Sequence, residues 1–458
     1  MNPPDQASDS TLSPQPVVRT PKAGRSPVRA AVASFAGGTL EYYDNHIYAL
    51  SATLVFSQVF FPNAGGVATL ASLATFGVSY VARPLGAILM GHFGDRVGRK
   101  RVLVFILVLM GACTFLVGCL PGYAQIGIWA PILLVTLRIL QGISIGGETA
   151  AATTLTIEVA PPRRRAFFTS WAPGGIVTGF VLASLVFMPI LALPKDQLLS
   201  WGWRIPFWFS VFVMVTGYII RKKLEEPEAF VEAKEENALV RVPLLEVFRS
   251  HWSAVIRVAL CSLAFMVDMI IKVFALSLAT GVYGISASTM LWVLIVSNVF
   301  APLTQPLLAM VSDRVGRKPV FIAGNLACAG SIFAYFGAIQ SGNIPLLFVT
   351  GFLSVSCAYA AVSAVYPSFF AEMFNLKVRQ TGMALGLQVG LIAAGFGPAV
   401  AIAFTAGTSD WLPVAVTTAI VTLIAIVAAL TAKETFRVPL HELGVPIERA
   451  AAKPSGSP

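Results

Sequence analysis

Charged residues are scarce in this chain of 458 residues: Asp, Glu, Lys and Arg make up 12% of it, whereas 56% is hydrophobic. The mean hydropathy is +0.77, far outside the range of soluble domains. This composition excludes a soluble globular protein. A membrane β-barrel is also excluded, because its strands alternate in polarity over about 10 residues, whereas the apolar runs here suit helices of about 20 residues.

Cysteines are few, and the sequence shows neither a nucleotide-binding loop nor a catalytic constellation. The five cysteines all lie inside apolar runs without the spacing of metal ligands. The chain has no G-x-x-x-x-G-K-[ST] loop, which argues against an ATP-driven pump, and no visible filter motif, which argues against a channel. We therefore expect no cofactor, no metal and no enzymatic activity.

Long apolar runs separated by short polar stretches make up most of the sequence. They predict an all-α membrane protein with twelve spans, at 31–58, 67–91, 101–120, 128–157, 167–192, 203–222, 252–282, 288–311, 319–339, 343–371, 380–406 and 410–432. The first 30 residues are rich in Pro and Ser and have no apolar core. They are predicted to be a flexible tail and not a cleaved signal.

Positive charges alternate between the two sides of this predicted bundle. Lys and Arg close to short loops stay in the cytoplasm, and basic residues precede span 1 and occupy every second loop after it: Arg96–Arg101, Arg163–Arg165, Arg221–Lys223, Arg314–Lys318, Lys377 with Arg379, and Lys433 with Arg437. Both termini are therefore predicted to be cytoplasmic. This topology accounts for the net charge of +10, so we expect no nucleic-acid partner.

Two charged motifs occur twice and indicate an internal duplication. The segment DRVGRK begins at Asp95 and returns 218 residues later at Asp313, and a glutamate seven positions before an arginine recurs at Glu158 and Glu372. The repeat length corresponds to six helices. We predict two pseudo-symmetric six-helix bundles, joined and flanked by cytoplasmic segments, with boundaries at 1–30 (tail), 31–222 (bundle), 223–251 (loop), 252–432 (bundle) and 433–458 (tail).

The sequence resembles the major facilitator superfamily over residues 31–432, because that family carries a basic heptapeptide between the second and third helix of each six-helix half. Three stretches, RPLGAILMGHFGDRVGRKRVLV, WAPILLVTLRILQGISIGGE and SWGWRIPF, are similar to its metabolite:proton symporter family, most of all to the shikimate transporter branch. The resemblance implies a monomeric secondary transporter in the lipid bilayer of the bacterial inner membrane. Such a protein moves a small organic acid anion together with protons by alternating access.

The duplicated heptapeptide is predicted to gate the cytoplasmic side, although a loop that only sets topology is the alternative. Glycine permits a sharp turn between helices, and Asp95 can accept hydrogen bonds from a helix N-terminus, where the helix dipole favours a negative charge. By resemblance that helix is span 11. The predicted gating residues are Asp95, Arg96, Gly98, Arg99, Asp313, Arg314, Gly316, Arg317, Glu158, Arg165, Glu372 and Arg379.

Loop charges and small residues complete the predicted gate. Glu158 with Arg163–Arg165, and Glu372 with Lys377 and Arg379, are interpreted as a supporting charge network, with solvated loop charges as the alternative. Spans 5 and 11 carry glycines at four-residue spacing, which predicts close helix contacts. We expect these glycines to line the seam between the halves, with permanent packing as the alternative.

Span 1 carries ionisable groups at membrane depth, where each costs about 2.5–3.5 kcal/mol at a helix centre on insertion scales. Glu41, Asp44 and Tyr48 share one helical face. Two close carboxylates repel each other, so one of them can hold a proton and release it on a change of access. Glu41 and Asp44 are therefore proton-coupling candidates, and a structural polar cluster is the alternative.

Spans 2 and 4 supply further candidates. Arg83 precedes Pro84, and the resemblance associates this arginine with the substrate, while snorkelling to the interface is the alternative. Arg138 matches the arginine that the superfamily associates with proton coupling. Glu148 is a second proton-coupling candidate in span 4, and an interhelical hydrogen bond is its alternative reading.

Span 7 departs from the family pattern. Asp268 and Lys272 stand four residues apart in the order that favours a helical ion pair. Either the two charges only neutralise each other, or Lys272 is an extra cation for the substrate. Tyr48 and Tyr366 complete the predicted substrate-binding set, although aromatic residues in membrane spans more often serve packing. His46 is expected to be structural.

Three hypotheses of function remain open. Proton-coupled uptake of an organic acid anion is favoured, because Arg83, Arg138 and Lys272 are three cations at membrane depth. Uptake of a zwitterionic osmolyte such as proline or betaine is the alternative, but that branch has a long C-terminal coiled coil and the tail here has no heptads. The third hypothesis is a membrane sensor that transports nothing.

Overall fold

The computed structural model describes residues 26–97, 99–222, 247, 249–376, 378–405, 410–440 and 442–443. Gly98, Lys377 and most of the predicted tails and central loop lie outside these residues. The helices of the first half are α1 (Pro27–Leu54), α2 (Phe56–Val59), η1 (Pro62–Val67), α3 (Ala68–Val97), α4 (Arg99–Cys119), α5 (Tyr123–Ile126), α6 (Trp129–Ile145), α7 (Glu148–Val159), η2 (Pro162–Arg164), α8 (Arg165–Thr169), α9 (Trp171–Leu191), α10 (Lys195–Ser200), η3 (Gly202–Arg204) and α11 (Ile205–Lys222).

The second half is likewise helical, and no strand occurs anywhere in the described chain. Its helices are α14 (Trp252–Ser262), η4 (Leu263–Phe265), α15 (Met266–Met269), η5 (Ile270–Phe274), α16 (Ala275–Gly281), α17 (Ala287–Val299), α18 (Ala301–Val315), α19 (Arg317–Ser341), α20 (Ile344–Phe352), η6 (Leu353–Tyr359), α21 (Ala360–Ala371), α22 (Arg379–Thr405) and α23 (Leu412–Thr431).

Helices coincide with all twelve predicted spans, so the all-α prediction is confirmed. Among the described residues, nine helical stretches are long and apolar enough by themselves to cross a membrane. The helices α1, α4 and α11 are not among these nine stretches. These three belong to the same bundle, since α1 packs on α9 and α4 on α11.

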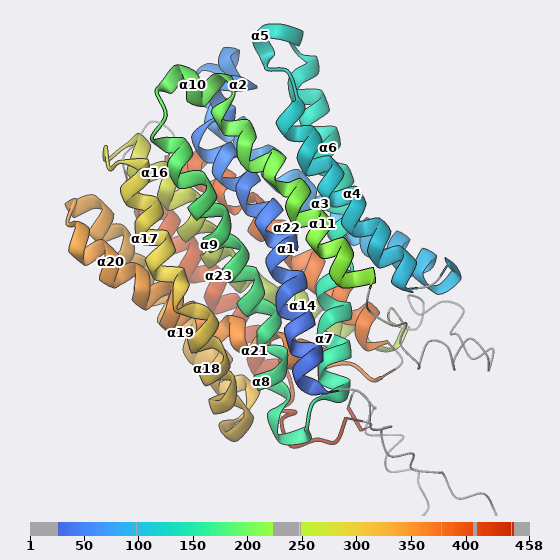
Figure 1. Ribbon diagram of the computed structural model, residues 1–458. Coiled ribbons are helices and arrows are strands. Elements are labelled where there is room, and N and C mark those ends of the chain that lie inside the picture. The colour runs from blue at the N-terminus through green and yellow to red at the C-terminus, as the bar shows by residue number, and fades with distance from the viewer. Residues whose placement is uncertain are drawn as a thin grey trace, which may run out of the picture.

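The two halves form one bundle of helices that run along a shared direction (Figure 1). They meet where α3 packs on α22 and where α9 packs on α17 and α18. The short helices α5 and α10 lie at one end of the bundle, and α8 lies beside α18 at the other. We call the end with α8 and both DRVGRK segments the basic end.

Helix α1 lies in the interior of this bundle. Every residue from Glu41 to Thr53 is buried, including Asp44, Asn45 and His46. A helix with so many polar groups is unfavourable against lipid, and burial among other helices provides partners for them. The polar face of α1 is therefore available to build a site.

The glycines of spans 5 and 11 pack inside their own halves. A Cβ at Gly175 of α9 would overlap the carbonyl of Phe35 in α1, and one at Gly390 of α22 would overlap that of Ala259 in α14. The predicted position of these stripes at the seam is therefore wrong, because they hold α9 against α1 and α22 against α14. At the seam itself, Gly395 of α22 makes room for Tyr80 of α3.

Three interior spans are irregular near the polar residues. Span 4 breaks at Gly146 and Gly147, between α6 and α7. Spans 7 and 10 contain the π-helical segments η5 and η6, with Lys272 inside η5 and Tyr359 at the end of η6. π-Helical turns are frequent at functional sites. The break and the two π-helical segments therefore indicate a candidate functional site at the centre of the bundle.

Candidate functional site

A continuous series of side-chain hydrogen bonds joins Asp44 to Arg138. Arg138 Nη1 donates to Gln141 Oε1 at 3.0 Å, Gln141 Nε2 donates to Thr114 Oγ1 at 2.7 Å, and Thr114 Oγ1 donates to Asp44 Oδ2 at 3.0 Å. All four residues are buried, and they come from α1, α4 and α6. We call this series the Asp44–Arg138 chain. The structure thus links two of the predicted proton-coupling residues through two neutral ones.

Arg138 is held by several acceptors besides Gln141. Its Nη2 donates to Ser79 Oγ at 2.7 Å, to the Phe76 carbonyl at 3.3 Å and to Asn45 Oδ1 at 3.4 Å. The guanidinium also lies 3.9 Å from the ring centroid of Tyr48. Tyr48 therefore contacts a predicted proton-coupling residue, although the sequence placed it in the substrate-binding set. These neutral partners stabilise the charge of Arg138 by hydrogen bonds and a cation–π contact.

Arg83 lies next to Arg138 and shares one partner with it. Its Nη2 donates to Asn45 Oδ1 at 3.5 Å, and its guanidinium lies 3.8 Å from the ring centroid of Tyr80. Glu41 is an electrostatic neighbour of this arginine. Arg83 Nε is buried and has no hydrogen-bond partner among the described residues. This group can therefore donate to a further acceptor.

Lys272 and Asp268 form a buried ion pair in span 7. Lys272 Nζ lies 2.8 Å from Asp268 Oδ1 and 2.9 Å from Oδ2. The same ammonium lies 4.7 Å from the ring centroid of Phe180 in α9, and the ring of His46 packs edge-on against that phenylalanine at 4.9 Å. Phe180 of the first half is thus shared between a residue of span 1 and a cation of the second half.

Span 10 brings aromatic residues toward the same centre. Tyr366 packs edge-on against Phe265 with ring centroids 4.8 Å apart, and it is an electrostatic neighbour of Glu41 in the first half. Tyr359 is a neighbour of Asp268. Predicted site residues from spans 1, 2, 7 and 10 therefore meet between the two halves.

These charged groups are closed off from solvent. The exposed fraction is 1% for Arg83 and Arg138, 2% for Lys272, and 3% for Glu41 and Asp44. A substrate or a proton in bulk water cannot contact them in this conformation. Access to the centre therefore requires a movement of helices, of the kind that hinge or shear motions provide.

Glu148 stands at the break in span 4 and is not one of the four residues of the Asp44–Arg138 chain. It is half-buried at the first position of α7, directly after the break in span 4. Gln388 of α22 donates to the Gly146 carbonyl at 2.9 Å, which ties this break to the second half. Gln388 is not among the residues predicted from the sequence. A single amide within the glycine-rich span 11 was the only signal for it.

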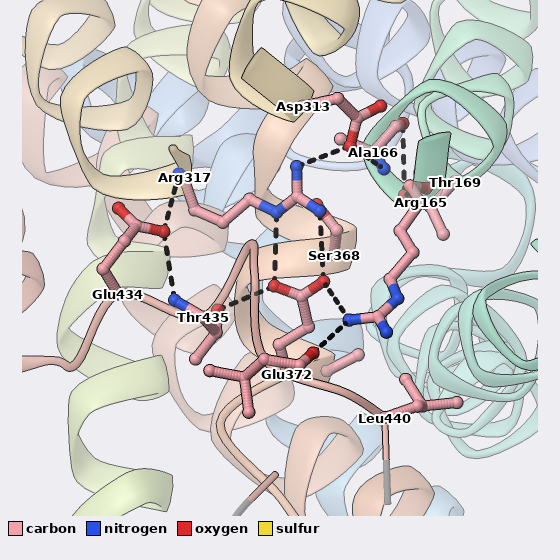
Figure 2. A network of polar contacts seen from close by, with 12 residues as sticks. Arg165, Ala166, Thr169, Asp313, Arg317, Ser368, Glu372, Glu434, Thr435 and Leu440 are labelled. Carbon is pink, nitrogen blue, oxygen red and sulfur yellow. Dashed lines mark hydrogen bonds and ion pairs between the residues drawn. The ribbon is translucent and has the colours of Figure 1, made fainter. Parts of the chain in front are cut away.

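Glu372 is the centre of a second polar network, which joins the two halves at the basic end (Figure 2). Arg317 Nη2 and Nε donate to the two oxygens of Glu372 at 3.1 and 3.2 Å, and Arg165 of the first half lies 3.6 Å from the same carboxylate. All three side chains are buried. Two basic side chains, one from each half, thus share one carboxylate.

Asp313 also joins the two halves at this end. Its carboxylate accepts hydrogen bonds from the backbone amides of Ala166 at 3.1 Å and Phe167 at 3.0 Å, in the first turn of α8. Arg317 holds the same carboxylate from the other side at 2.7 Å (Figure 2). An acidic side chain at a helix N-terminus satisfies unpaired amides and is favoured by the helix dipole.

The segment after span 12, which the sequence predicts to be a tail, also joins this network. Glu434 accepts hydrogen bonds from the backbone amides of Arg317 at 2.9 Å and Lys318 at 3.0 Å. Thr435 Oγ1 donates to Glu372 at 2.7 Å (Figure 2). An acidic residue soon after the last span was the one available signal. It was missed because the tail has no repeat or apolar pattern.

Glu372 and Arg379, which the sequence placed in one charge network, interact electrostatically but take different hydrogen-bond partners. The guanidinium of Arg379 donates to three backbone carbonyls, of Ala371, Phe374 and Leu440, and Glu372 instead binds Arg317 and Arg165. Glu158 is exposed and interacts electrostatically with Arg379. The Arg314 side chain is exposed as well. The network around Glu372 therefore crosses between the halves.

The two copies of DRVGRK are described to different extents. Asp95 and Arg96 lie in the last turn of α3 and Arg99 begins α4, but the contacts of these side chains, like Gly98 itself, are outside the described part of the chain. In the second copy, Gly316 has φ of 116°, which an L side chain rarely adopts. Glycine is thus required for the turn between α18 and α19.

Replacing Asp313 by alanine is expected to open the basic end. The change removes the carboxylate that caps α8 across the halves, and hydrogen bonds to charged groups contribute about 1.5–3 kcal/mol each. The ratio of open to closed molecules should rise at least about tenfold. Spin labels at two exposed positions of the basic end, Arg164 and Arg314, would report a longer distance by pulsed dipolar spectroscopy, with the exposed Cys119 and Cys357 replaced by alanine.

The matched control for this change is Asp410→Ala. Asp410 also accepts a hydrogen bond from a helix N-terminal amide, that of Leu412 at 2.9 Å, but within its own half. The label distance should not respond to it. If Asp313→Ala leaves the distance distribution as it is in the unmodified protein, the cap does not hold the halves together.

Comparison with known proteins identifies the family. Residues 29–242 match the family described as Sugar (and other) transporter, and residues 258–453 match the Major Facilitator Superfamily. The chain is 37% identical over 416 residues to the shikimate transporter of Escherichia coli (strain K12), covering 89% of this chain and 95% of that protein. It is 32% identical to the glycine betaine/proline/ectoine/pipecolic acid transporter OusA of Dickeya dadantii (strain 3937), covering 90% and 84%.

Solved structures agree at the level of the fold. The xylose transporter XylE from E. coli, in a partially occluded inward open conformation, superimposes with a TM-score of 0.69 at 19% identity, covering 89% of this chain and 98% of that one. The resemblance inferred from DRVGRK and the six-helix repeat is therefore confirmed. This chain belongs to the major facilitator superfamily, and with twelve transmembrane helices in two six-helix bundles it is a membrane transporter and not an enzyme.

Proposed function

We propose that this protein takes up a small organic acid anion together with protons by alternating access. The observation that carries the proposal is the Asp44–Arg138 chain. It joins a buried carboxylate to a buried arginine through neutral residues, inside a bundle whose halves are tied together at the basic end. A buried carboxylate that can exchange its proton when access changes is what proton coupling needs.

Arg83 is the residue best suited to bind the anion. Its planar guanidinium matches a carboxylate, and its buried Nε has no hydrogen-bond partner among the described residues. Tyr366 lies toward the same centre from the second half, so we propose that it lines the substrate site. Tyr48 packs on Arg138 instead. For Tyr48 we therefore propose a role in holding that arginine.

Lys272 and Asp268 are proposed to form the other wall of the substrate site. Their ion pair is buried and lies against Phe180 of the first half. Asp268 already neutralises Lys272, so an anion would have to share the ammonium with that carboxylate. The pair would thus act on selectivity, and Arg83 would supply most of the attraction.

The basic end is proposed to be the cytoplasmic gate of a single-chain transporter in the bacterial inner membrane. Asp313 and Glu372 bind groups of both halves there, and hydrogen bonds and ion pairs of this kind can break and re-form during each cycle. For the first DRVGRK copy, gating by Asp95, Arg96, Gly98 and Arg99 stays a prediction, as does proton coupling by Glu41 and Glu148.

Uptake of a zwitterionic osmolyte is the second candidate function. The relative from Dickeya dadantii is named for glycine betaine and proline. Asp268 has Tyr359 as a neighbour and, through Lys272, the ring of Phe180 close by. A carboxylate together with aromatic faces is a suitable environment for an ammonium group. The two candidates differ in the net charge of the substrate, which an uptake experiment can separate.

Uptake into proteoliposomes tests the proposed function. Purified protein would be supplied with labelled shikimate, α-ketoglutarate, citrate, benzoate or betaine, with and without an inward proton gradient. We expect one of the acids to accumulate only with the gradient, and a protonophore to abolish this. Accumulation of betaine alone would favour the second candidate. The absence of both uptake and counterflow for every compound would contradict the proposal. Uptake driven by sodium instead of protons would contradict it as well.

A further inference from the structure

Thr114 occupies the middle of the Asp44–Arg138 chain and has two acceptors for one hydrogen. Its Oγ1 lies 3.0 Å from Asp44 Oδ2 and also 3.0 Å from the Met110 carbonyl of its own helix. A hydroxyl group has a single O–H, so it can donate to only one of them at a time. The two directions differ only by rotation of the hydroxyl hydrogen.

The other hydrogen bonds of the Asp44–Arg138 chain determine which hydrogen bonds Thr114 can make. Arginine only donates, so the oxygen of the Gln141 amide must face Arg138 and its NH₂ must face Thr114. The Thr114 oxygen therefore already accepts one hydrogen bond. It has one lone pair and one O–H left for its two remaining neighbours.

We propose that Thr114 is a positioning residue that reports the protonation state of Asp44 to Arg138. When Asp44 is ionised, Thr114 donates to it, and every hydrogen bond from Arg138 to Asp44 points the same way. Such aligned chains reinforce one another. The inference rests on the proposed proton coupling and names the route by which the proton is sensed.

Protonation of Asp44 reverses the last bond of the chain. The new carboxyl O–H donates to Thr114, whose own hydrogen turns to the Met110 carbonyl. Thr114 then accepts from Asp44 and from Gln141, so the two donors converge on one oxygen and the alignment with Arg138 is lost. One proton has been added, no heavy atom has moved, and no buried donor is left without an acceptor. The change in alignment alters how firmly Arg138 is held.

Other ionisable groups on the helices around Asp44 do not replace Thr114. The ionisable residues of α1 itself include Glu41, Tyr42, Tyr43, His46 and Tyr48. The surrounding elements contribute Tyr80 and Arg83 on α3, Cys113 on α4, Arg138 on α6, Glu148 and Glu158 on α7, Arg165 on α8 and Lys272 on η5. Thr114 is the hydrogen-bond partner that the described residues offer to the Asp44 carboxylate. Replacing the Thr114 hydroxyl therefore affects the Asp44 carboxylate directly and the neighbouring charged side chains only indirectly.

Infrared titration of the purified protein tests the proposal without a substrate. The carboxyl band that Asp44→Asn removes identifies Asp44, and its amplitude is followed against pH. Thr114→Val keeps the shape and removes the donor to the carboxylate, so the midpoint should move to higher pH by about one unit or more. Thr114→Ser keeps the hydroxyl and should restore it. Thr136→Val, on the exposed face of α6, is the matched control.

A double-mutant cycle tests the link to Arg138. Gln141→Leu should shift the Asp44 midpoint when Thr114 is present and should have little effect in the Thr114→Val protein. Equal shifts in both backgrounds, an unmoved midpoint in Thr114→Val, or an Asp44 band that never titrates would each overturn the proposal. Because the readout is proton binding by Asp44, these failures are distinct from a failure of the transport assay in wild-type vesicles.

Discussion

Asp44→Asn is expected to abolish proton-driven accumulation and to leave counterflow exchange. Asparagine has the size of aspartate and still offers an oxygen to Thr114, which donates to Asp44 in the native chain. It cannot gain or lose a proton at neutral pH. A gradient of one pH unit can support about tenfold accumulation per proton, and the ratio of internal to external substrate should fall to one. Labelled uptake into vesicles, with and without the gradient, measures this.

Exchange without a gradient distinguishes lost coupling from a misfolded protein. Counterflow needs substrate binding and alternating access but no net proton movement, so it should persist in the Asp44→Asn variant. Asp196→Asn, at an exposed carboxylate of α10, is the matched control and should behave as the unmodified protein. Full accumulation in a protein with both Glu41→Gln and Asp44→Asn would remove span 1 from the coupling mechanism.

The single variants Asp268→Asn and Lys272→Gln are expected to unfold at markedly lower temperature. Each leaves its partner as an uncompensated charge that is almost completely buried, at 2% exposure for Lys272 and 5% for Asp268. Breaking a buried ion pair in this way costs about 3–5 kcal/mol. Thermal unfolding in detergent, followed by intrinsic fluorescence, measures the loss.

The double variant separates stability from substrate binding. Asp268→Asn with Lys272→Gln keeps the site neutral, so the protein should fold close to normally. If Lys272 contacts the anion, substrate affinity should still weaken about tenfold, roughly 1.4 kcal/mol. If affinity is unchanged, the pair is structural and Arg83 alone attracts the substrate. Double variants at Ser253 and Arg257, a hydrogen-bonded pair in which both groups are at least partly exposed, serve as the control.

The sequence by itself determined the fold and the set of candidate residues. A chain with few charges and long apolar runs has to span the membrane, and basic loops that alternate define one topology. The duplicated DRVGRK segment then specifies two six-helix halves. Because an ionisable group inside a bilayer is costly, the few that occur stand out without any structure. Asp44, Arg138, Asp268 and Lys272 were found in this way.

Contacts between distant helices could not be obtained from the sequence. Thr114 is one neutral residue among many in apolar helices, and only packing of α1, α4 and α6 makes it the bridge between Asp44 and Arg138. Hydroxyl and amide side chains are inexpensive in membrane helices, so they leave no signal in the composition.

Only the tertiary structure decided how the charges at the basic end pair. Sequence proximity suggested Glu372 with Arg379, but the carboxylate binds Arg317 and faces Arg165 of the other half. The segment after span 12 contributes Glu434 to the same network, and no sequence pattern in that segment predicts this contact. Spacing along one helix limits which of its own side chains can meet. Contacts between helices depend on how the two halves pack, because packing decides which of several possible partners lies closest to a buried charge.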